Sequence, residues 1–181
     1  MEMTKARILR RIAGLGFALE SWFALSNLLI TFRAGVTGPV LYWAAASFLG
    51  VLLAAVSMFT EKDRLLALGS ALEFFYLIHE NLSFYRGAMP FIREDPFISS
   101  YMIIIAMTII AWLLLFCAGT QPGRAEKIGF MASAILLVRL FVEAVSGLLT
   151  ADSLPLLFAA FFLALSAREA NQEKDGKAGW D

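Results

Sequence analysis

Several ionisable side chains lie inside stretches of this sequence that are otherwise apolar. The clearest stretch runs from Arg64 to Arg86 and holds Glu73 and Glu80, seven residues apart. An ionised carboxylate within a bilayer is costly, so such groups usually face a protein interior or a watery cavity. Residues at this spacing lie on one face of a helix. The two glutamates therefore predict an acidic site inside a bundle of helices.

Two further apolar stretches carry comparable pairs. In each of the three, a charged residue lies near the middle, and a second polar residue follows four or seven positions later on the same helix face. The pairs are Glu20 with Asn27, Glu73 with Glu80, and Arg139 with Glu143. Together with Tyr76 and His79, these are the candidate residues for binding a substrate or a cation. We expect three polar stripes to converge on one interior cavity that opens outward, with the other helices around them.

The candidate site holds more acid than base. Its four glutamates face one arginine and one histidine, so some must be protonated or must meet another cation. Burial among like charges favours the protonated form. Two interpretations stay open at this point: a site that exchanges protons or binds a cation, and a set of inert, protonated glutamates.

Arg139 needs an acidic partner within the membrane. We expect an ion pair across helices with Glu20 or Glu73, and the alternative is Glu143, one turn away on the same helix. Whether Arg139 belongs to the site or only fixes the helices remains open. His79 is more often a satisfied structural residue than a ligand, and it lies on a different helix face from Glu80.

Composition indicates an all-α integral membrane protein. The 181 residues are 60% hydrophobic and 17% charged, with a mean hydropathy of +0.74, far more apolar than a soluble domain. A net charge of zero gives no indication of nucleic-acid binding. A single histidine excludes a multi-histidine zinc site, and no metal site is predicted. No motif identifies a catalytic residue or a cofactor.

Six apolar stretches predict a six-helix transmembrane bundle. They cover residues 12–32, 40–59, 65–85, 97–118, 128–149 and 154–167, within one membrane domain of residues 1–167. The last stretch is short for a bilayer core of ~30 Å, which leaves open whether it crosses fully. Residues 168–181 are polar, and we expect a disordered cytoplasmic tail.

The basic residues predict the orientation. Eleven of the 15 lysines and arginines lie in the two terminal segments and in the second and fourth loops. The positive-inside rule then places both termini in the cytoplasm. We expect a multi-pass protein of a bacterial-type cytoplasmic membrane.

Part of the sequence is repeated. Leu15-Gly-Phe-Ala-Leu-Glu20 and Leu68-Gly-Ser-Ala-Leu-Glu73 share five of six residues. The match predicts parallel two-helix hairpin repeats, a symmetry known in transporters. Chance similarity between apolar helices is the alternative.

These features favour a small membrane transporter or solute-binding membrane protein with a central acidic cavity. Its ligand would be an organic or inorganic cation, or a proton-coupled substrate. The alternatives are an integral-membrane enzyme that uses a glutamate as acid or base on a lipid-soluble substrate, and a non-catalytic subunit of a larger complex. A cavity open to the outside would support the first function, an opening at leaflet level the second, and a solid interior the third. The expected partners are the lipid bilayer and a small-molecule or cationic ligand; a homo-oligomer or a larger membrane complex is left open, and no nucleic acid is expected.

Overall fold

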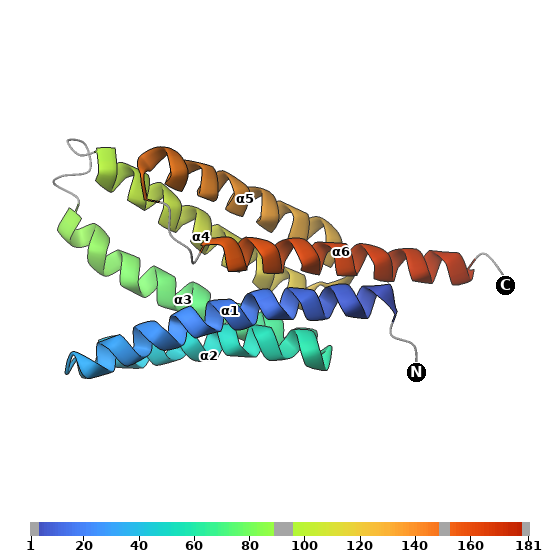
Figure 1. The fold of residues 1–181 in the computed structure, drawn as a ribbon, viewed down its shortest axis with the longest axis horizontal. Helices are drawn as coiled ribbons and strands as arrows, with labels where there is room; N and C mark the ends of the chain where they lie inside the picture. Colours follow the sequence, from blue (N-terminus) through green and yellow to red (C-terminus); the bar gives the residue numbers. More distant parts are fainter. Residues whose placement is uncertain (1–3, 89–95, 149–152, 179–181) are drawn as a thin grey trace.

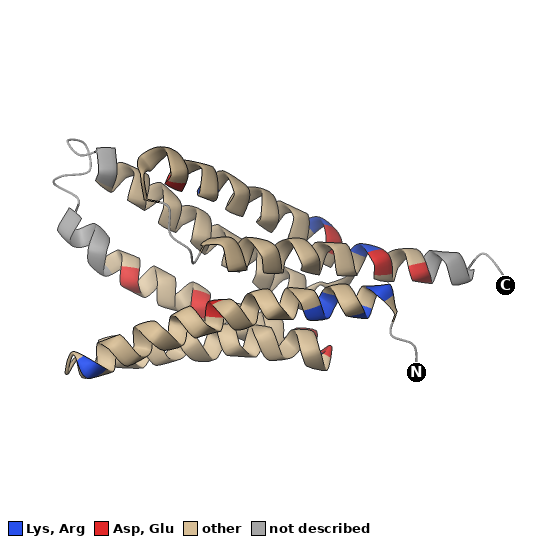
Figure 2. Ribbon diagram, viewed as in Figure 1, with Lys and Arg blue, Asp and Glu red and all other residues tan. Residues whose placement is uncertain are grey.

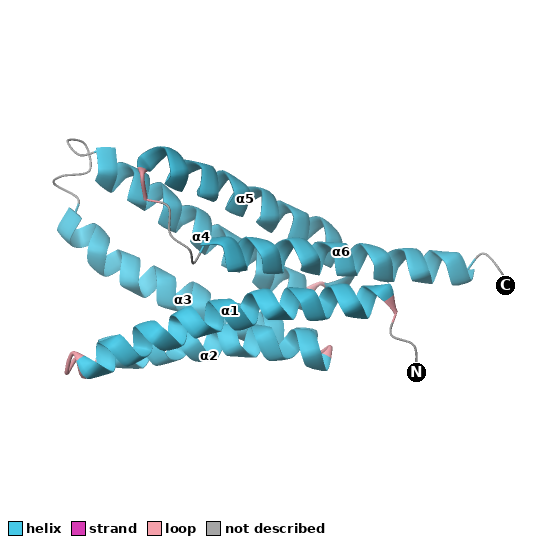
Figure 3. Ribbon diagram, in the orientation of Figure 1, coloured by secondary structure: helices cyan, strands magenta, loops and turns pink. Residues whose placement is uncertain are grey.

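Six α-helices make up the described part of the chain. The computed structural model describes residues 4–88, 96–148 and 153–178, and these ranges contain no strand (Figure 3). The helices are α1 (Lys5–Arg33), α2 (Pro39–Thr60), α3 (Asp63–Ala88), α4 (Pro96–Thr120), α5 (Ala125–Ser146) and α6 (Ser153–Ala178), with a 3-10 turn, η1 (Pro122–Arg124), before α5. The predicted all-helical class is confirmed for these residues.

The helices form a closed ring. Each one packs against its neighbours in sequence, and α6 closes the ring against α1. Both chain termini lie at one end of the bundle, which we call the terminal end (Figure 1). The helices converge there, and α1 and α2 diverge from α4 and α5 toward the opposite end, the far end (Figure 1).

An apolar core fills the terminal half of the ring. Phe17, Met58, Leu66 and Leu115 are at most 1% exposed within it. The ring of Phe17 lies against that of Trp112, with centroids 6.0 Å apart. These side chains come from four different helices, so the core holds the ring closed at this end.

Glycines let the helices approach closely. A Cβ built on Gly16 of α1 would lie 2.8 Å from the carbonyl oxygen of Pro155 on α6. A Cβ built on Gly119 of α4 would lie 2.6 Å from the backbone nitrogen of Ala67 on α3. Both distances are too short for real side chains, so these crossings depend on small residues, as is common where helices pack in membranes.

Ion pairs and a hydrogen bond join the helices at the terminal end. Arg10 of α1 pairs with Asp63 of α3 at 2.5 Å, and Lys5 pairs with Glu169 of α6 at 2.9 Å. The Ser166 hydroxyl donates to the Ala6 carbonyl oxygen at 2.8 Å. Charged residues are concentrated at this end (Figure 2). The ends of three helices are thus fixed to one another outside the apolar core.

Five of the helices are long and apolar enough to cross a membrane: α1, α2, α4, α5 and α6. Large apolar side chains such as Trp22, Phe32 and Phe141 are exposed on their outer faces, where a lipid environment would cover them. These helices indicate a multi-pass membrane protein. The polar residues of α3 place it outside this set, although it has 26 residues and packs between α2 and α4. A sixth span therefore remains a proposal.

Helix α6 differs from the prediction at its carboxyl end. Residues 168–178, expected as a disordered tail, continue the helix that begins at Ser153. The physical reason is composition: this segment is rich in Ala, Glu, Lys and Gln, which favour helix even when they are polar. Residues 149–152, and residues 179–181 at the end of the predicted tail, lie outside the described residues.

Candidate functional site

A polar cavity of about 450 Å³ occupies the centre of the far half of the ring. Helices α1 to α5 all contribute to its wall. Its polar and aromatic lining residues are Glu20, Phe23, Asn27, Ser47, Glu73, Tyr76, Glu80, Tyr101, Thr108, Trp112, Arg139 and Glu143. All of the candidate residues predicted from the sequence line this cavity, apart from His79. The three polar stripes therefore meet in space, while their role in binding stays a prediction.

Helix periodicity explains how the stripes reach the cavity. Glu73, Tyr76 and Glu80 follow one another at spacings of three and four residues along α3, so all three side chains lie on one helix face. Glu20 and Asn27 on α1 are related in the same way. Figure 2 shows acidic residues within α3 and α5, away from the charged terminal end.

The cavity is closed at its floor and open at its mouth. Ser47, Glu73 and Trp112 are at most 7% exposed and lie toward the apolar core. Asn27 and Glu80, farther along their helices, are exposed. The cavity therefore opens toward the far end of the bundle, away from both termini.

Glu73 is the most enclosed acidic group of α3. Its carboxyl group has the Ser47 hydroxyl of α2 as a hydrogen-bonding neighbour and the Glu80 carboxylate as a like-charged neighbour. Its Oε2 atom is buried and has no hydrogen-bond partner among the described residues. A buried oxygen without a partner is costly. A proton or a bound ligand at this position would remove that cost.

Arg139 pairs along its own helix rather than across the bundle. Its Nε atom lies 2.8 Å from Oε1 of Glu143, one turn away on α5. The expected pair with Glu20 or Glu73 is therefore wrong, and the alternative partner is the observed one. The reason is geometric: an i,i+4 pair meets on one helix face, whereas the cavity lies between α5 and the other two helices.

A hydrogen bond also connects the ion pair to the start of α6. The Ser153 hydroxyl donates to Oε2 of Glu143, whose side chain is almost fully buried. Glu143 thus accepts from α5 through one oxygen and from α6 through the other. This arrangement positions Arg139 at the cavity wall and fixes the first turn of α6 beside it.

His79 does not reach the cavity. Its ring stacks on Trp43 of α2, with centroids 4.7 Å apart. Because His79 directly precedes Glu80 in α3, its side chain lies on a different face of the helix from that of Glu80. We therefore remove His79 from the candidate site.

Sequence reasoning missed the contributions of α2 and α4. Ser47, Tyr101, Thr108 and Trp112 line the cavity, although the even-numbered helices were expected only to surround it. These residue types are uncharged and also occur on the outer faces of membrane helices. The sequence alone therefore does not distinguish them from residues that face lipid. For Ser47, a signal was Gly50 one turn later, a small residue at a close helix crossing; no comparable signal marks the three residues of α4.

The cavity lining carries more acid than base. Among its described residues, Arg139 is the one cationic side chain, and Glu143 already pairs with it. Glu73 and Glu80 add carboxylates to the same space. The described residues include no group of three or more His, Cys, Asp or Glu close enough to hold a metal ion. The excess of carboxylates over basic groups is suited to a proton or to a cation.

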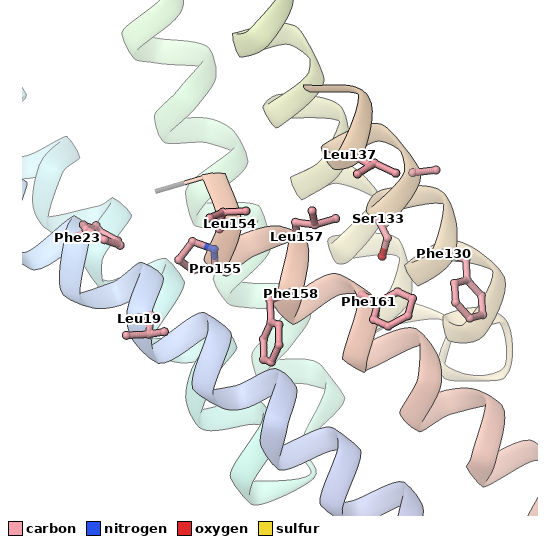
Figure 4. Close-up of a pocket in the computed structure, with 11 residues that line it drawn as sticks. Leu19, Phe23, Phe130, Ser133, Leu137, Leu154, Pro155, Leu157, Phe158 and Phe161 are labelled. Atoms are coloured by element: carbon pink, nitrogen blue, oxygen red, sulfur yellow. The ribbon is translucent and has the colours of Figure 1, made fainter. Parts of the chain in front are cut away.

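An apolar groove of about 940 Å³ lies beside the cavity, between α1, α5 and α6 (Figure 4). Leu19 and Phe23 line it from α1, Phe130 and Leu137 from α5, and Leu154, Pro155, Leu157, Phe158 and Phe161 from α6. Phe23 lines both the groove and the polar cavity. The two spaces are therefore neighbours.

Comparisons with protein-family models, with curated proteins and with solved structures found no match to this chain.

Proposed function

We propose that this membrane protein binds an organic cation in its central acidic cavity, as a solute-binding protein or a transporter. The observation that carries the proposal is Glu73, a buried carboxyl group with an unpartnered oxygen at the floor of an open cavity. Glu80 adds a second carboxylate nearer the mouth. The ligand would enter from the far end, where the cavity opens.

Charge balance supports a cationic ligand. Carboxylates inside a membrane protein are stable only when a proton, a basic group or a bound cation offsets them. Arg139 is engaged by Glu143, and among the described residues of the cavity wall Glu73 and Glu80 form no ion pair with a basic side chain. A cation at the floor would lie within reach of both Glu73 and the buried Ser47 hydroxyl.

The size and the aromatic lining support an organic cation. A volume of about 450 Å³ holds a small organic molecule rather than a single desolvated ion. Phe23, Tyr76, Tyr101 and Trp112 contribute to the wall. Aromatic faces attract ammonium groups, and the attraction strengthens where water is excluded. Carboxylates and aromatic rings together form the usual surroundings of a bound organic ammonium ion.

Protons should compete with this ligand. Glu73 faces Ser47 from α2 and lies on the same face of α3 as Tyr76 and Glu80. The other groups that face the same cavity are Glu20 from α1, Tyr101 and Trp112 from α4, and Arg139 with Glu143 from α5. Protonation of a carboxyl group removes the charge that attracts the cation. Affinity is therefore expected to fall as the pH is lowered, and to be regained as the pH rises and the glutamates ionise.

Glu73→Gln and Glu80→Gln test the proposal, with Glu61→Gln as the control at an exposed carboxylate of the terminal end. The measurement is thermal stabilisation of the purified protein by small ammonium ions, beginning with tetramethylammonium, across a series of pH values. We expect Glu73→Gln to weaken binding by about tenfold or more, which corresponds to about 1.4 kcal/mol, and to flatten its pH dependence. Glu61→Gln should bind as the wild type does.

Two results would overturn the proposal. The first is that no ammonium ion in the series stabilises the wild-type protein at any pH. The second is that the folded double variant, Glu73→Gln with Glu80→Gln, binds as well as the wild type and with the same pH dependence.

The apolar groove favours a second candidate, an integral-membrane enzyme for a lipid-soluble substrate. A substrate could approach from the leaflet along the groove and reach the carboxyl groups past Phe23. Glu73 would then act as a general acid or base. Conversion of a bound compound to a product, lost in Glu73→Gln while binding is retained, would favour this candidate over the first.

A further inference from the structure

We infer that the ligand is an amphiphile, with its cationic head in the acidic cavity and a single alkyl chain in the groove between α1, α5 and α6. This inference rests on the proposed function and adds the class of ligand. It connects the polar cavity with the apolar groove, which the sequence did not predict.

The boundary between the two spaces is thin. Phe23 of α1 lines both of them. At the start of α6, the Ser153 hydroxyl bonds to Glu143 on the cavity wall, whereas the next residue, Leu154, lines the groove. Among the described residues, Phe23 of α1 and the first turn of α6 separate the carboxylates from the apolar wall.

The groove offers an alkyl chain an uninterrupted apolar surface. Aliphatic and aromatic side chains line it from three helices (Figure 4). Ser133 is the one hydroxyl among the lining residues, and it donates to the Gly129 carbonyl oxygen within α5 at 2.8 Å. Its polarity is thus satisfied inside the helix. The groove presents no described polar group that would repel a hydrocarbon chain.

Energetics explain why a head group must accompany the chain. Lipid tails are as apolar as this groove, so moving a chain from the bilayer into it gains little from the hydrophobic effect, and the gain must come from closer van der Waals packing against the side chains of the groove. The carboxylates supply the attraction that a chain alone lacks. The groove in turn lets a long-chain cation keep its tail in an apolar environment while its head reaches Glu73.

Ala134→Trp tests the groove, and Ala45→Trp is its matched control. Both alanines are exposed, Ala134 in the groove wall on α5 and Ala45 on α2, outside every described cavity. The probes are tetramethylammonium and decyltrimethylammonium, added to protein in phosphatidylglycerol nanodiscs, with partitioning into empty nanodiscs subtracted. We expect the decyl chain to strengthen binding to the wild type and to Ala45→Trp by about tenfold. In Ala134→Trp, most of this gain should be lost.

A second measurement uses the wild-type chain alone. A decylammonium ion with a photoreactive group at the end of its chain should label residues of α5 and α6 that line the groove, and excess tetramethylammonium should suppress this labelling. Labelling spread evenly over the outer faces of all helices would overturn the inference.

The outcomes separate this inference from the proposed function. If both probes bind equally well, depend on Glu73 and are unaffected by Ala134→Trp, the cavity binds cations and the inference about the chain is wrong. If neither probe depends on Glu73, the proposed function itself is wrong.

Discussion

The ion pair between Arg139 and Glu143 shows how one charged side chain can be fixed inside an apolar bundle. Glu143 is 1% exposed and accepts hydrogen bonds from both Arg139 and Ser153. Burying a charge is tolerated when its partners are in place. The hydrogen bond from Ser153 to Glu143 therefore joins α6 to the ion pair of α5 at the cavity wall.

Arg139→Ala should destabilise the protein strongly, because it leaves the Glu143 carboxylate buried without its cation. The expected loss is about 3–5 kcal/mol. Glu143→Gln should cost less, since the glutamine oxygen can still accept from Arg139, and the Ser153 hydroxyl can turn to accept from the new amide nitrogen. Thermal unfolding of the two purified variants in the same detergent measures the difference.

Lys5→Ala provides the comparison for this prediction. Lys5 pairs with Glu169 at the exposed terminal end, where an ion pair contributes about 0–1 kcal/mol. An unfolding midpoint for Arg139→Ala as high as that of Glu143→Gln would contradict the role assigned to the buried pair.

Residue spacing predicted which side chains meet but not how they pair. The seven-residue spacing of Glu73 and Glu80 correctly placed both on one face, because helix periodicity is local. The partner of Arg139 depends on distances between helices, which spacing within one helix does not give. His79 was included because of its chemistry, although its neighbour Glu80 already occupied the cavity face.

The crossing of α2 and α3 depends on two glycines. A Cβ built on Gly69 would lie 2.8 Å from the backbone nitrogen of Ala54 and would overlap the Gly50 carbonyl oxygen. This crossing lies one turn from Glu73 on α3 and one turn from Ser47 on α2. The close approach therefore sets the width of the cavity floor.

Gly69→Ala should push α3 away from α2. We expect a loss of stability of about 1–3 kcal/mol, as for other overpacked sites, together with weaker cation binding, because Glu73 moves with its helix. The measurements are thermal unfolding and ammonium binding on the same preparation. Gly123→Ala, at a position with open space around it, should change neither. Unaltered binding in a folded Gly69→Ala protein would show that the crossing does not position Glu73.

The repeated segments occupy equivalent places in the ring. Gly16 of α1 packs against α6 and Gly69 of α3 packs against α2, in each case the preceding helix around the ring. Glu20 and Glu73, four residues later, both line the cavity. The interpretation of the sequence match as a repeat stays a prediction. The sequence pattern did not predict the full length of α6, because the polar carboxyl end of this helix has no apolar periodicity.

At the scale of the whole molecule, the ring has a packed half and an open half. The apolar core and the ion pairs are concentrated at the terminal end, and the polar cavity lies toward the far end. Hydropathy predicted the number of helices. It could not predict this asymmetry, which depends on where small residues let the helices converge.

Cysteine labelling tests the proposed six-span topology with cytoplasmic termini. In a Cys117→Ser background, Lys62→Cys and Arg124→Cys should react with a membrane-impermeant reagent only when it reaches the cytoplasmic side. Thr37→Cys, exposed in the α1–α2 connection at the far end, should react from outside in intact cells. Reaction of Lys62→Cys or Arg124→Cys from outside would contradict the topology.

The one-sided opening of the cavity has an electrical consequence in a living cell. Under the proposed topology, a cation that moves from Glu80 to Glu73 advances about 10 Å along α3, roughly a third of a bilayer core of ~30 Å. A membrane potential that is negative inside draws it in that direction. Because a full crossing is worth about 2.3 kcal/mol per charge at 100 mV, this partial crossing would contribute about 0.8 kcal/mol. The voltage of an energised membrane would then hold the ligand about fourfold more tightly than a depolarised one.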